Sequence, residues 1–466
     1  MKNGKLFQLI RKLSPAERQQ FQDFLHSPFH NKREDCLRLW AALEGIKEGP
    51  LPEKERLFEK SYPNSPYDDQ RFRLLQSALL GLLESFLVLQ GLRQNELEQE
   101  LILVREYRKR GMEKHLRGAK RRAEKQLEGL KTADALRVKH DIEKETFLLE
   151  AQKNQMGPLG YQPLIDLWDE YYLAMKLYQA CSAKSHESVA NTPYDYGLLD
   201  ALLERADWER YMSIPAISLY YHGYWMRVSP KGEAHFASFK RALLEHGNSF
   251  PLAERRDLFM VAANYCARKY NEGRNDYARE SNEIYKAGLA CGAFLAQGQF
   301  NRFTFRNIVL NALVVGDFEW AEQFIEDYQT YLPSHFQEGT VSFTRALLEY
   351  QRQNYGQALQ LLQKSEYGDV VFNLSARALL IKIYYETGEY DLLDAHLAAM
   401  RIFIRRQKNP SYLEVNYRQL VYFAQRLLEL NPYEPGDKAR LREEVMATKA
   451  VAEKDWLLRM LEKTSD

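Results

Sequence analysis

The sequence is poor in cysteine. Its 466 residues include four cysteines, Cys36, Cys181, Cys266 and Cys291, and no two of them form a CxxC pair. Disulfide-rich secreted domains and cysteine-based zinc sites both need clustered, regularly spaced cysteines. The scattered positions exclude both kinds of site, and we expect the protein to work in the reducing cytoplasm.

An excess of charge of one sign is also missing. Lys and Arg total 65 and Asp and Glu total 64, which leaves a net charge of +1 at pH 7. Proteins whose whole surface attracts nucleic acid or an anionic membrane are strongly basic. The balanced charge excludes that class and leaves only a local basic patch as a candidate.

Long apolar runs are absent as well. The most apolar stretch, Leu74 to Leu89, contains a glutamine, a glutamate and two serines, whereas a membrane span needs about 18–20 mostly apolar residues. We therefore predict a buried helix there and no membrane span. Arg11, Lys12 and Glu17 interrupt the apolar core that an export signal requires.

The familiar catalytic motifs are missing too. The sequence contains no GxxxxGK[ST], GxGxxG, HExxH or GxSxG, which mark phosphate-binding loops, dinucleotide sites, zinc proteases and serine hydrolases. Among the ten histidines only His26 and His30 have the i, i+4 spacing of a ligand pair, and Pro28 separates them. We predict a protein that is not an enzyme and uses no cofactor and no metal.

Helical periodicity dominates what is present. Apolar residues recur at three- and four-residue spacing along nearly the whole chain, and period-two alternation is almost absent, which predicts an all-α fold. Ser14-Pro-Ala-Glu17 combines an N-cap serine, a first-turn proline and a capping-box glutamate. We predict a helical N-terminal module over residues 1–92 that ends in a long helix from about Asp69.

The following stretch is highly charged. Residues 93–195 read as charged helical hairpins followed by a linker, because apolar residues are sparse and glycines break the pattern. The polar segment from Ser182 to Thr192 is the best candidate for that linker.

A short pattern recurs in the second half of the chain. Asn275-Asp-Tyr277, Gly316-Asp-Phe318, Gln353-Asn-Tyr355 and Gly388-Glu-Tyr390 each place polar or glycine residues before an aromatic, and the aromatics lie 41, 37 and 35 residues apart. Such periods are typical of helix-pair arrays, in which each pair must stack on its neighbours to bury its apolar face.

These units resemble the tetratricopeptide repeat (TPR). In the best unit, Arg302 to Pro333, Phe305 and Ala312 match helix A of the family and Phe318 and Ala321 match helix B. The resemblance covers about residues 216–430, with insertions and without the usual first tryptophan. It implies a TPR-like solenoid over residues 196–432 and capping helices over residues 433–466, where Trp456 is expected to pack. The layout is similar to that of bacterial helical-repeat proteins with a helical N-terminal module.

The family binds partners through a concave groove lined by helix A residues. Aromatic and basic anchors at such positions suit peptide or protein recognition, and the alternative is that the tyrosines pack between helices. The matching positions are Tyr220, Tyr224, Arg227, Tyr265, Lys269, Arg306, Tyr350, Lys382 and Tyr385.

A run of basic residues is the second candidate site. It could follow phosphates along nucleic acid, or it could be a solvated helix face neutralised by acidic residues of the adjacent segments, such as Glu100, Asp141, Glu143 and Glu145. Its members are Arg105, Arg108, Lys109, Arg110, Lys114, Arg117, Lys120, Arg121, Arg122 and Lys125.

We therefore expect a non-catalytic scaffold that binds a peptide or a helical partner in the concave face of the solenoid. The alternative is a nucleic-acid-associated or regulatory protein that binds through the basic run at residues 105–125. The N-terminal module could dock on the solenoid, mediate self-association into a homo-oligomer, or hold a second partner.

Overall fold

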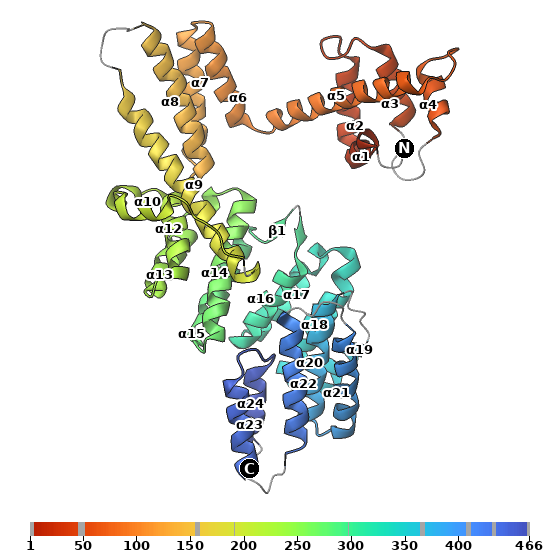
Figure 1. Ribbon diagram of the computed structural model, residues 1–466, viewed down its shortest axis with the longest axis vertical. Coiled ribbons are helices and arrows are strands. Elements are labelled where there is room, and N and C mark those ends of the chain that lie inside the picture. Colours follow the sequence, from red (N-terminus) through yellow and green to blue (C-terminus); the bar gives the residue numbers. More distant parts are fainter. Residues whose placement is uncertain are drawn as a thin grey trace. The chain divides into compact units, whose positions relative to one another are not determined.

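A computed structural model describes residues 4–44, 52–153, 159–190, 192–296, 298–363, 369–406, 412–430 and 435–463. In these residues the chain forms 24 α-helices, and the strands are β1 (Leu295–Ala296) and β2 (Gln299–Phe300), which pair antiparallel. The predicted all-α class is confirmed. The chain divides into two compact units, unit 1 (Met1–Tyr172) and unit 2 (Leu173–Asp466), coloured from red to blue in Figure 1.

The N-terminal module of unit 1 contains five helices around one core. Phe21, Trp40, Phe58 and Phe72 are almost fully buried in it. The predicted capping box at Ser14 is present, because Glu17 donates its backbone N–H to the Ser14 hydroxyl and accepts the Ser14 N–H. The helices are α1 (Lys5–Lys12), α2 (Pro15–His26), α3 (Glu34–Leu43), α4 (Lys54–Ser61) and α5 (Asp69–Arg93).

Helix α5 contains the apolar stretch noted in the sequence. By length and composition it is the one helix among the described residues that could cross a membrane. Its buried side chains, among them Phe72, Leu79 and Leu83, belong to the core of the module. Leu74 and Val88 are exposed, so the prediction of a buried helix holds for one face of α5 only.

Three charged helices follow in unit 1 and pack against one another: α6 (Glu96–Lys109), α7 (Glu113–Leu127) and α8 (Ala133–Lys153). Their apolar contacts are few and small. One cluster joins Leu101 to Val138 and Ile142, and another joins Val104 to Leu116. We refer to these helices as the charged bundle.

The predicted linker is wrong in its position. Helix α9 runs without a break from Tyr161 to Ala190, so most of the segment from Ser182 to Thr192 is helical. An ion pair between Lys184 and Glu187, one turn apart at 2.6 Å, supports this last part of the helix. The division between the two compact units falls inside α9, after Tyr172.

Unit 2 is built mainly from consecutive helix pairs. In each pair we call the first helix the A helix and the second the B helix. The pairs are α12 (Pro215–Val228) with α13 (Gly232–His246), α14 (Leu252–Asn271) with α15 (Asp276–Ala290), α16 (Arg302–Val314) with α17 (Phe318–Tyr328), α18 (Ser334–Gln351) with α19 (Tyr355–Gln363), and α20 (Val370–Glu386) with α21 (Tyr390–Arg405).

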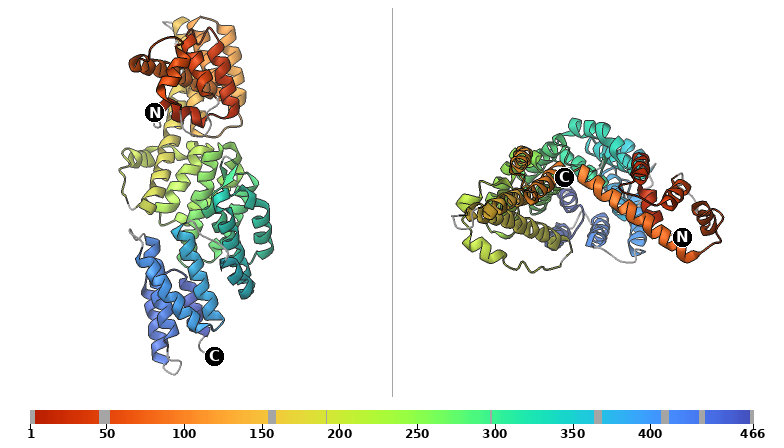
Figure 2. Two further views of the ribbon diagram at one scale, coloured as in Figure 1. Left: turned by 90° about the vertical axis from the view of Figure 1, so that its right-hand side faces the viewer. Right: turned by 90° about the horizontal axis from the view of Figure 1, so that it is seen from above.

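Each pair packs on the next one. The B helices α13, α15, α17 and α19 contact the A helix that follows them, and A helices also contact each other, as in α16 with α18 and α18 with α20. The pairs therefore follow one another in space in the order of the chain, from yellow-green to blue (Figures 1 and 2). The short helices α10 (Leu199–Arg205) and α11 (Trp208–Tyr211) precede them, and α22 (Tyr412–Leu428), α23 (Pro435–Ala447) and α24 (Lys454–Lys463) follow.

The recurring sequence pattern marks the turn inside a pair. In four pairs the second residue after the A helix has a left-handed conformation, with φ of 91° at Gly273, 80° at Gly316, 63° at Gln353 and 76° at Gly388. In each turn the residue directly after the left-handed one donates its backbone N–H to the carbonyl five residues earlier. An example is the bond from Asp317 N to Ala312 O at 2.9 Å. This is the 6→1 bond of a Schellman cap.

Gln353 is the one non-glycine residue in these four left-handed positions, and this makes it a test of the turn. The left-handed conformation costs an L residue about 1–2 kcal/mol, and glycine avoids this cost. Gln353→Gly should therefore raise the free energy of unfolding by about 1 kcal/mol, measured by urea denaturation.

The matched control is Gly316→Ala. A Cβ at this glycine would meet no atom within 4 Å, so the substitution tests the backbone alone and should lower the free energy of unfolding by about 1 kcal/mol. A neutral or destabilising Gln353→Gly would show that this turn stores no strain.

Candidate functional site

The structure buries much of the predicted groove. Tyr220, Tyr224, Tyr265, Tyr350 and Lys382 expose less than a tenth of their surface. The other four predicted positions, Arg227, Lys269, Arg306 and Tyr385, are half-buried. The prediction that the tyrosines form an exposed lining needs correction, since four of them pack between helices, which was the alternative interpretation.

Half-buried carboxylates hold two of these tyrosines. The Tyr220 hydroxyl donates to Glu254 at the start of α14, and the Tyr350 hydroxyl donates to Glu386 at the end of α20 at 2.5 Å. Burial and the neighbouring carboxylate raise the pKa of both phenols well above the ordinary value. Both tyrosines therefore stay neutral donors that tie one A helix to a later one.

Glu386 is the centre of a polar cluster in unit 2. Its carboxylate accepts hydrogen bonds from Tyr350 in α18, from Tyr355 at 2.7 Å in α19, and from the Trp456 indole N–H at 2.8 Å in α24. One turn earlier in α20, the Lys382 ammonium pairs with Glu453 at 2.8 Å and lies 4.7 Å from the centre of the Tyr350 ring. We call these six residues the Glu386 cluster.

The sequence indicated only part of this cluster. Trp456 was expected to pack the cap, and it is 1 % exposed. The roles of Glu386 and Glu453 were missed, because Glu386 and Trp456 lie 70 residues apart and single-sequence patterns do not show such pairings. The one available signal was the Glu-x-x-Trp spacing at the start of the last helix.

The A helices differ in how much surface they leave open. Along α14 one face is exposed, with Asp257, Asn264 and Arg268, and Val314 is exposed at the end of α16. Along α18 and α20, by contrast, buried residues point in all directions. They include Phe343, Thr344, Ala346, Leu347, Leu348 and Tyr350 in α18, and Leu374, Ala376, Ala378, Leu379, Ile381, Lys382 and Ile383 in α20.

The basic run lies in the charged bundle, and seven of its ten side chains form ion pairs. The partners are intrahelical glutamates or the acidic residues of the neighbouring helices. The pairs are Arg105 with Asp141 and Glu145, Arg108 with Glu145, Lys109 and Arg110 with Glu106, Arg117 with Glu113, Lys120 with Glu143, and Arg122 with Glu100.

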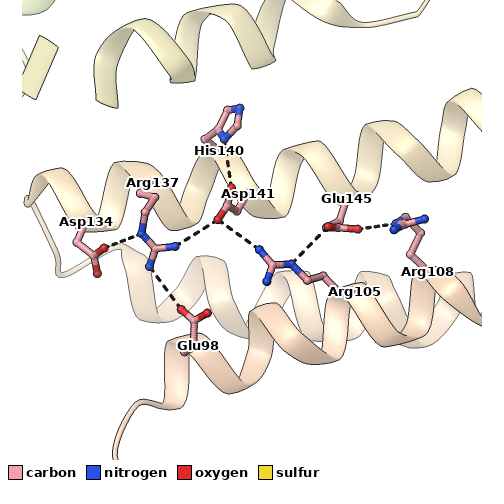
Figure 3. Close-up of polar contacts among 8 residues, drawn as sticks. All are labelled: Glu98, Arg105, Arg108, Asp134, Arg137, His140, Asp141 and Glu145. Atoms are coloured by element: carbon pink, nitrogen blue, oxygen red, sulfur yellow. Dashed lines mark hydrogen bonds and ion pairs between the residues drawn. The ribbon is translucent and has the colours of Figure 1, made fainter. Parts of the chain in front are cut away.

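Figure 3 shows how the ion pairs join α6 to α8. Asp141 lies between Arg137 and Arg105 at 3.2 and 3.4 Å, and Glu145 lies between Arg105 and Arg108 at 3.4 and 2.5 Å. These side chains are mostly half-buried, so the pairs are screened less than those on an open surface. The network uses much of the basic charge to hold the bundle together.

Three members of the run remain available to a ligand. Lys114, Arg121 and Lys125 are exposed and have no ion-pair partner among the described residues. Their spacing of seven and four residues places them on one face of α7. This short stripe is what the structure leaves of the predicted nucleic-acid patch.

A histidine pair lies between α12 and α13. The Nδ1 atoms of His222 and His235 are 3.0 Å apart, and His235 stacks on Trp225. One ring must donate and the other accept, so at most one of the two rings is protonated while this contact persists. Burial, the facing His235 and the nearby Arg241 lower the pKa of His222 to about 4, and burial lowers the pKa of His235.

Metal-ligating side chains do not gather in the described residues, where no group of three or more His, Cys, Asp and Glu could hold a metal ion. No protein-family model, no curated protein and no solved structure matches this chain. Any functional assignment must therefore be argued from the residues of the chain itself.

Glu145 should be the critical residue of the charged bundle. Its side chain is 10 % exposed and faces two arginines, so Glu145→Gln leaves a half-buried cation without its partner. The substitution should lower the free energy of unfolding by roughly 1–2 kcal/mol. Glu124→Gln is the control, because Glu124 is exposed and 4.0 Å from Lys120, and it should change stability by less than about 0.5 kcal/mol. Equal effects of the two substitutions would contradict this role.

The histidine pair should make the protein sensitive to mild acid. An unfolded chain protonates His222 near pH 6.5, whereas the native ring resists protonation until about pH 4. The unfolded state therefore binds more protons in this window, and the free energy of unfolding should fall as the pH drops from 7 to 4, by roughly 2 kcal/mol from this residue. His222→Gln should flatten the slope of stability against pH, measured by thermal denaturation. An unchanged slope would contradict the assignment.

Proposed function

We propose that this protein is a non-catalytic scaffold and that unit 2 is a TPR-like solenoid that binds a peptide or helical segment of a partner protein on its exposed A-helix face. The observation that carries the proposal is the four-fold repetition of one turn, with the same backbone bond and an aromatic residue at the start of each B helix. Stacked helix pairs of this kind present long surfaces, because equivalent side chains recur on successive A helices.

The location of the surface follows from exposure. Asp257, Asn264 and Arg268 of α14 line an open face, and Leu310 and Val314 of α16 add apolar area that is half-buried and exposed. Arginine and aliphatic side chains together are a usual composition for a protein-binding surface. Of the nine predicted groove residues, Tyr265, Lys269 and Arg306 belong to these two helices; Tyr265 is buried, and Lys269 and Arg306 are half-buried.

The four cysteines support a reducing compartment. All of them are free thiols, and Cys36, Cys181 and Cys266 are buried. Burial raises the pKa of the Cys36 and Cys181 thiols to about 11, so both stay protonated and unreactive at neutral pH. We place the protein in the cytoplasm on this basis.

The test is site-specific photocrosslinking in the full-length protein. A photoreactive residue at Val314, which is 49 % exposed on an A helix, should form a nuclease-resistant crosslink to a protein in native cell extract. The control is the same residue at Leu392, which is 52 % exposed on the B helix α21 and should form none. Arg268→Glu should reduce the Val314 crosslink at least five-fold.

Crosslinks from Leu392 with none from Val314 would overturn the proposal, because the partner would then lie on the B-helix side. The third position is Arg121 in α7. Nuclease-sensitive crosslinks from Arg121 alone would move the function to the basic run. With three free cations on that face, the dependence of binding on salt would correspond to about three phosphate contacts, well below that of a dedicated nucleic-acid protein.

A further inference from the structure

We propose that α24 is a resident ligand on the A-helix face of α18 and α20, and that an external amphipathic helix with a glutamate and, three residues later, a tryptophan exchanges with it. This inference rests on the proposed function. It adds the chemistry of the partner segment and a means of regulating access to the surface.

The contacts of α24 are those of a bound segment. Glu453, the residue before the helix, pairs with Lys382, and the Trp456 indole donates to Glu386 one turn further along α20. The Trp456 ring also lies edge-on to Tyr385, with 5.7 Å between the ring centres. Glu453 and Trp456, three residues apart, thus contact Lys382 and Glu386, which lie four residues apart on α20.

A charged residue of α24 and the charged residue before it influence side chains of three A helices. Burial raises the pKa of Tyr270 in α14 and of Tyr350 in α18, and the positive charge of Arg459 in α24 opposes both shifts. Burial lowers the pKa of Arg306 in α16, and the charge of Glu453 is one of those that oppose this change. The charges of Arg459 and Glu453 therefore lie near side chains of α14, α16 and α18.

The apolar face of α24 lies in a shared core. The core that contains Ala378 and Ile381 of α20 also contains Trp456, Leu457, Met460 and Leu461 of α24, together with residues of α22 and α23, on which α24 also packs. The four apolar residues of α24 fall at i, i+1, i+4 and i+5, which is one face of a helix. The partner chemistry is therefore an amphipathic helix with a Glu-x-x-Trp start.

Two features of Glu453 favour exchange of α24 for an external helix. Glu453 has φ of 55°, a left-handed conformation that costs a non-glycine residue about 1–2 kcal/mol, and its side chain is 37 % exposed although Lys382 is buried. An external carboxylate can therefore reach the rim of the site and replace a strained one.

The first test uses a fluorescent peptide with the sequence of residues 448–463 and full-length protein, with binding followed by fluorescence anisotropy. Glu453→Ala/Trp456→Ala empties the site, so this variant should bind the peptide at least ten-fold more tightly than the wild type does. Adding Lys382→Glu to the variant should weaken binding at least ten-fold, and a peptide with alanine in place of its tryptophan should not bind. Equal binding to wild type and variant, or binding indifferent to Lys382→Glu, would overturn the proposal.

The second test covers the case in which the double variant misfolds. Glu453→Ala alone removes one partly exposed side chain, and hydrogen exchange read by mass spectrometry should then be at least ten-fold faster in residues 448–463 and unchanged in α18 and α20. Glu462→Ala, in the exposed end of the same helix, is the control and should change neither. Faster exchange of α20 together with α24 would show an integral cap and overturn the proposal.

The two proposals fail separately. A Val314 crosslink without peptide binding would remove only the resident-ligand inference, because the open face of α14 and α16 would still bind a protein. Loss of both results would remove the protein-binding assignment as well.

Discussion

One backbone hydrogen bond recurs through unit 2 and sets the geometry on which its other contacts depend. It joins the carbonyl near the end of four A helices, α14, α16, α18 and α20, to the N–H five residues later, and it requires a left-handed residue between them. Because this turn fixes how the B helix leaves the A helix, it also fixes which faces of a pair are left to contact the next pair. The bonds from Tyr350 and Tyr355 to Glu386, which join two such pairs, depend on that arrangement.

Shared carboxylates are the second device that both units use. Glu386 accepts donors from three other helices, and Glu145 faces two arginines of a neighbouring helix. A carboxylate with several partners is well ordered, whereas the same group with one partner missing would be costly to bury. In unit 2 this arrangement joins α24 to helices 70 residues earlier, and in the charged bundle it takes up charge that could otherwise meet a phosphate backbone.

The sequence predicted what local rules determine. The capping box at Ser14 and the positions of the four turns depend on residues within one or two helical turns of each other, and all of them appear in the structure. Burial of Tyr220 and Tyr350 could not be predicted, because it depends on Glu254, Glu386 and α24, which no periodicity connects to them. The linker prediction at Ser182 failed for a different reason. Its polar composition favours a loop, and contacts such as Lys184 with Glu187 support a helix instead.

The charged bundle and the N-terminal module belong to one compact unit and are held by different forces, which separates their responses to temperature and solvent. Heating lowers the free-energy cost of removing charges from water, so ion pairs keep more of their contribution to stability as the temperature rises. Added sulfate strengthens apolar burial around Trp40 and Phe72 while it screens the pairs around Glu145. Dilute solution and sulfate-rich solution thus favour opposite parts of the same unit, and the less stable of the two parts changes with the salt concentration.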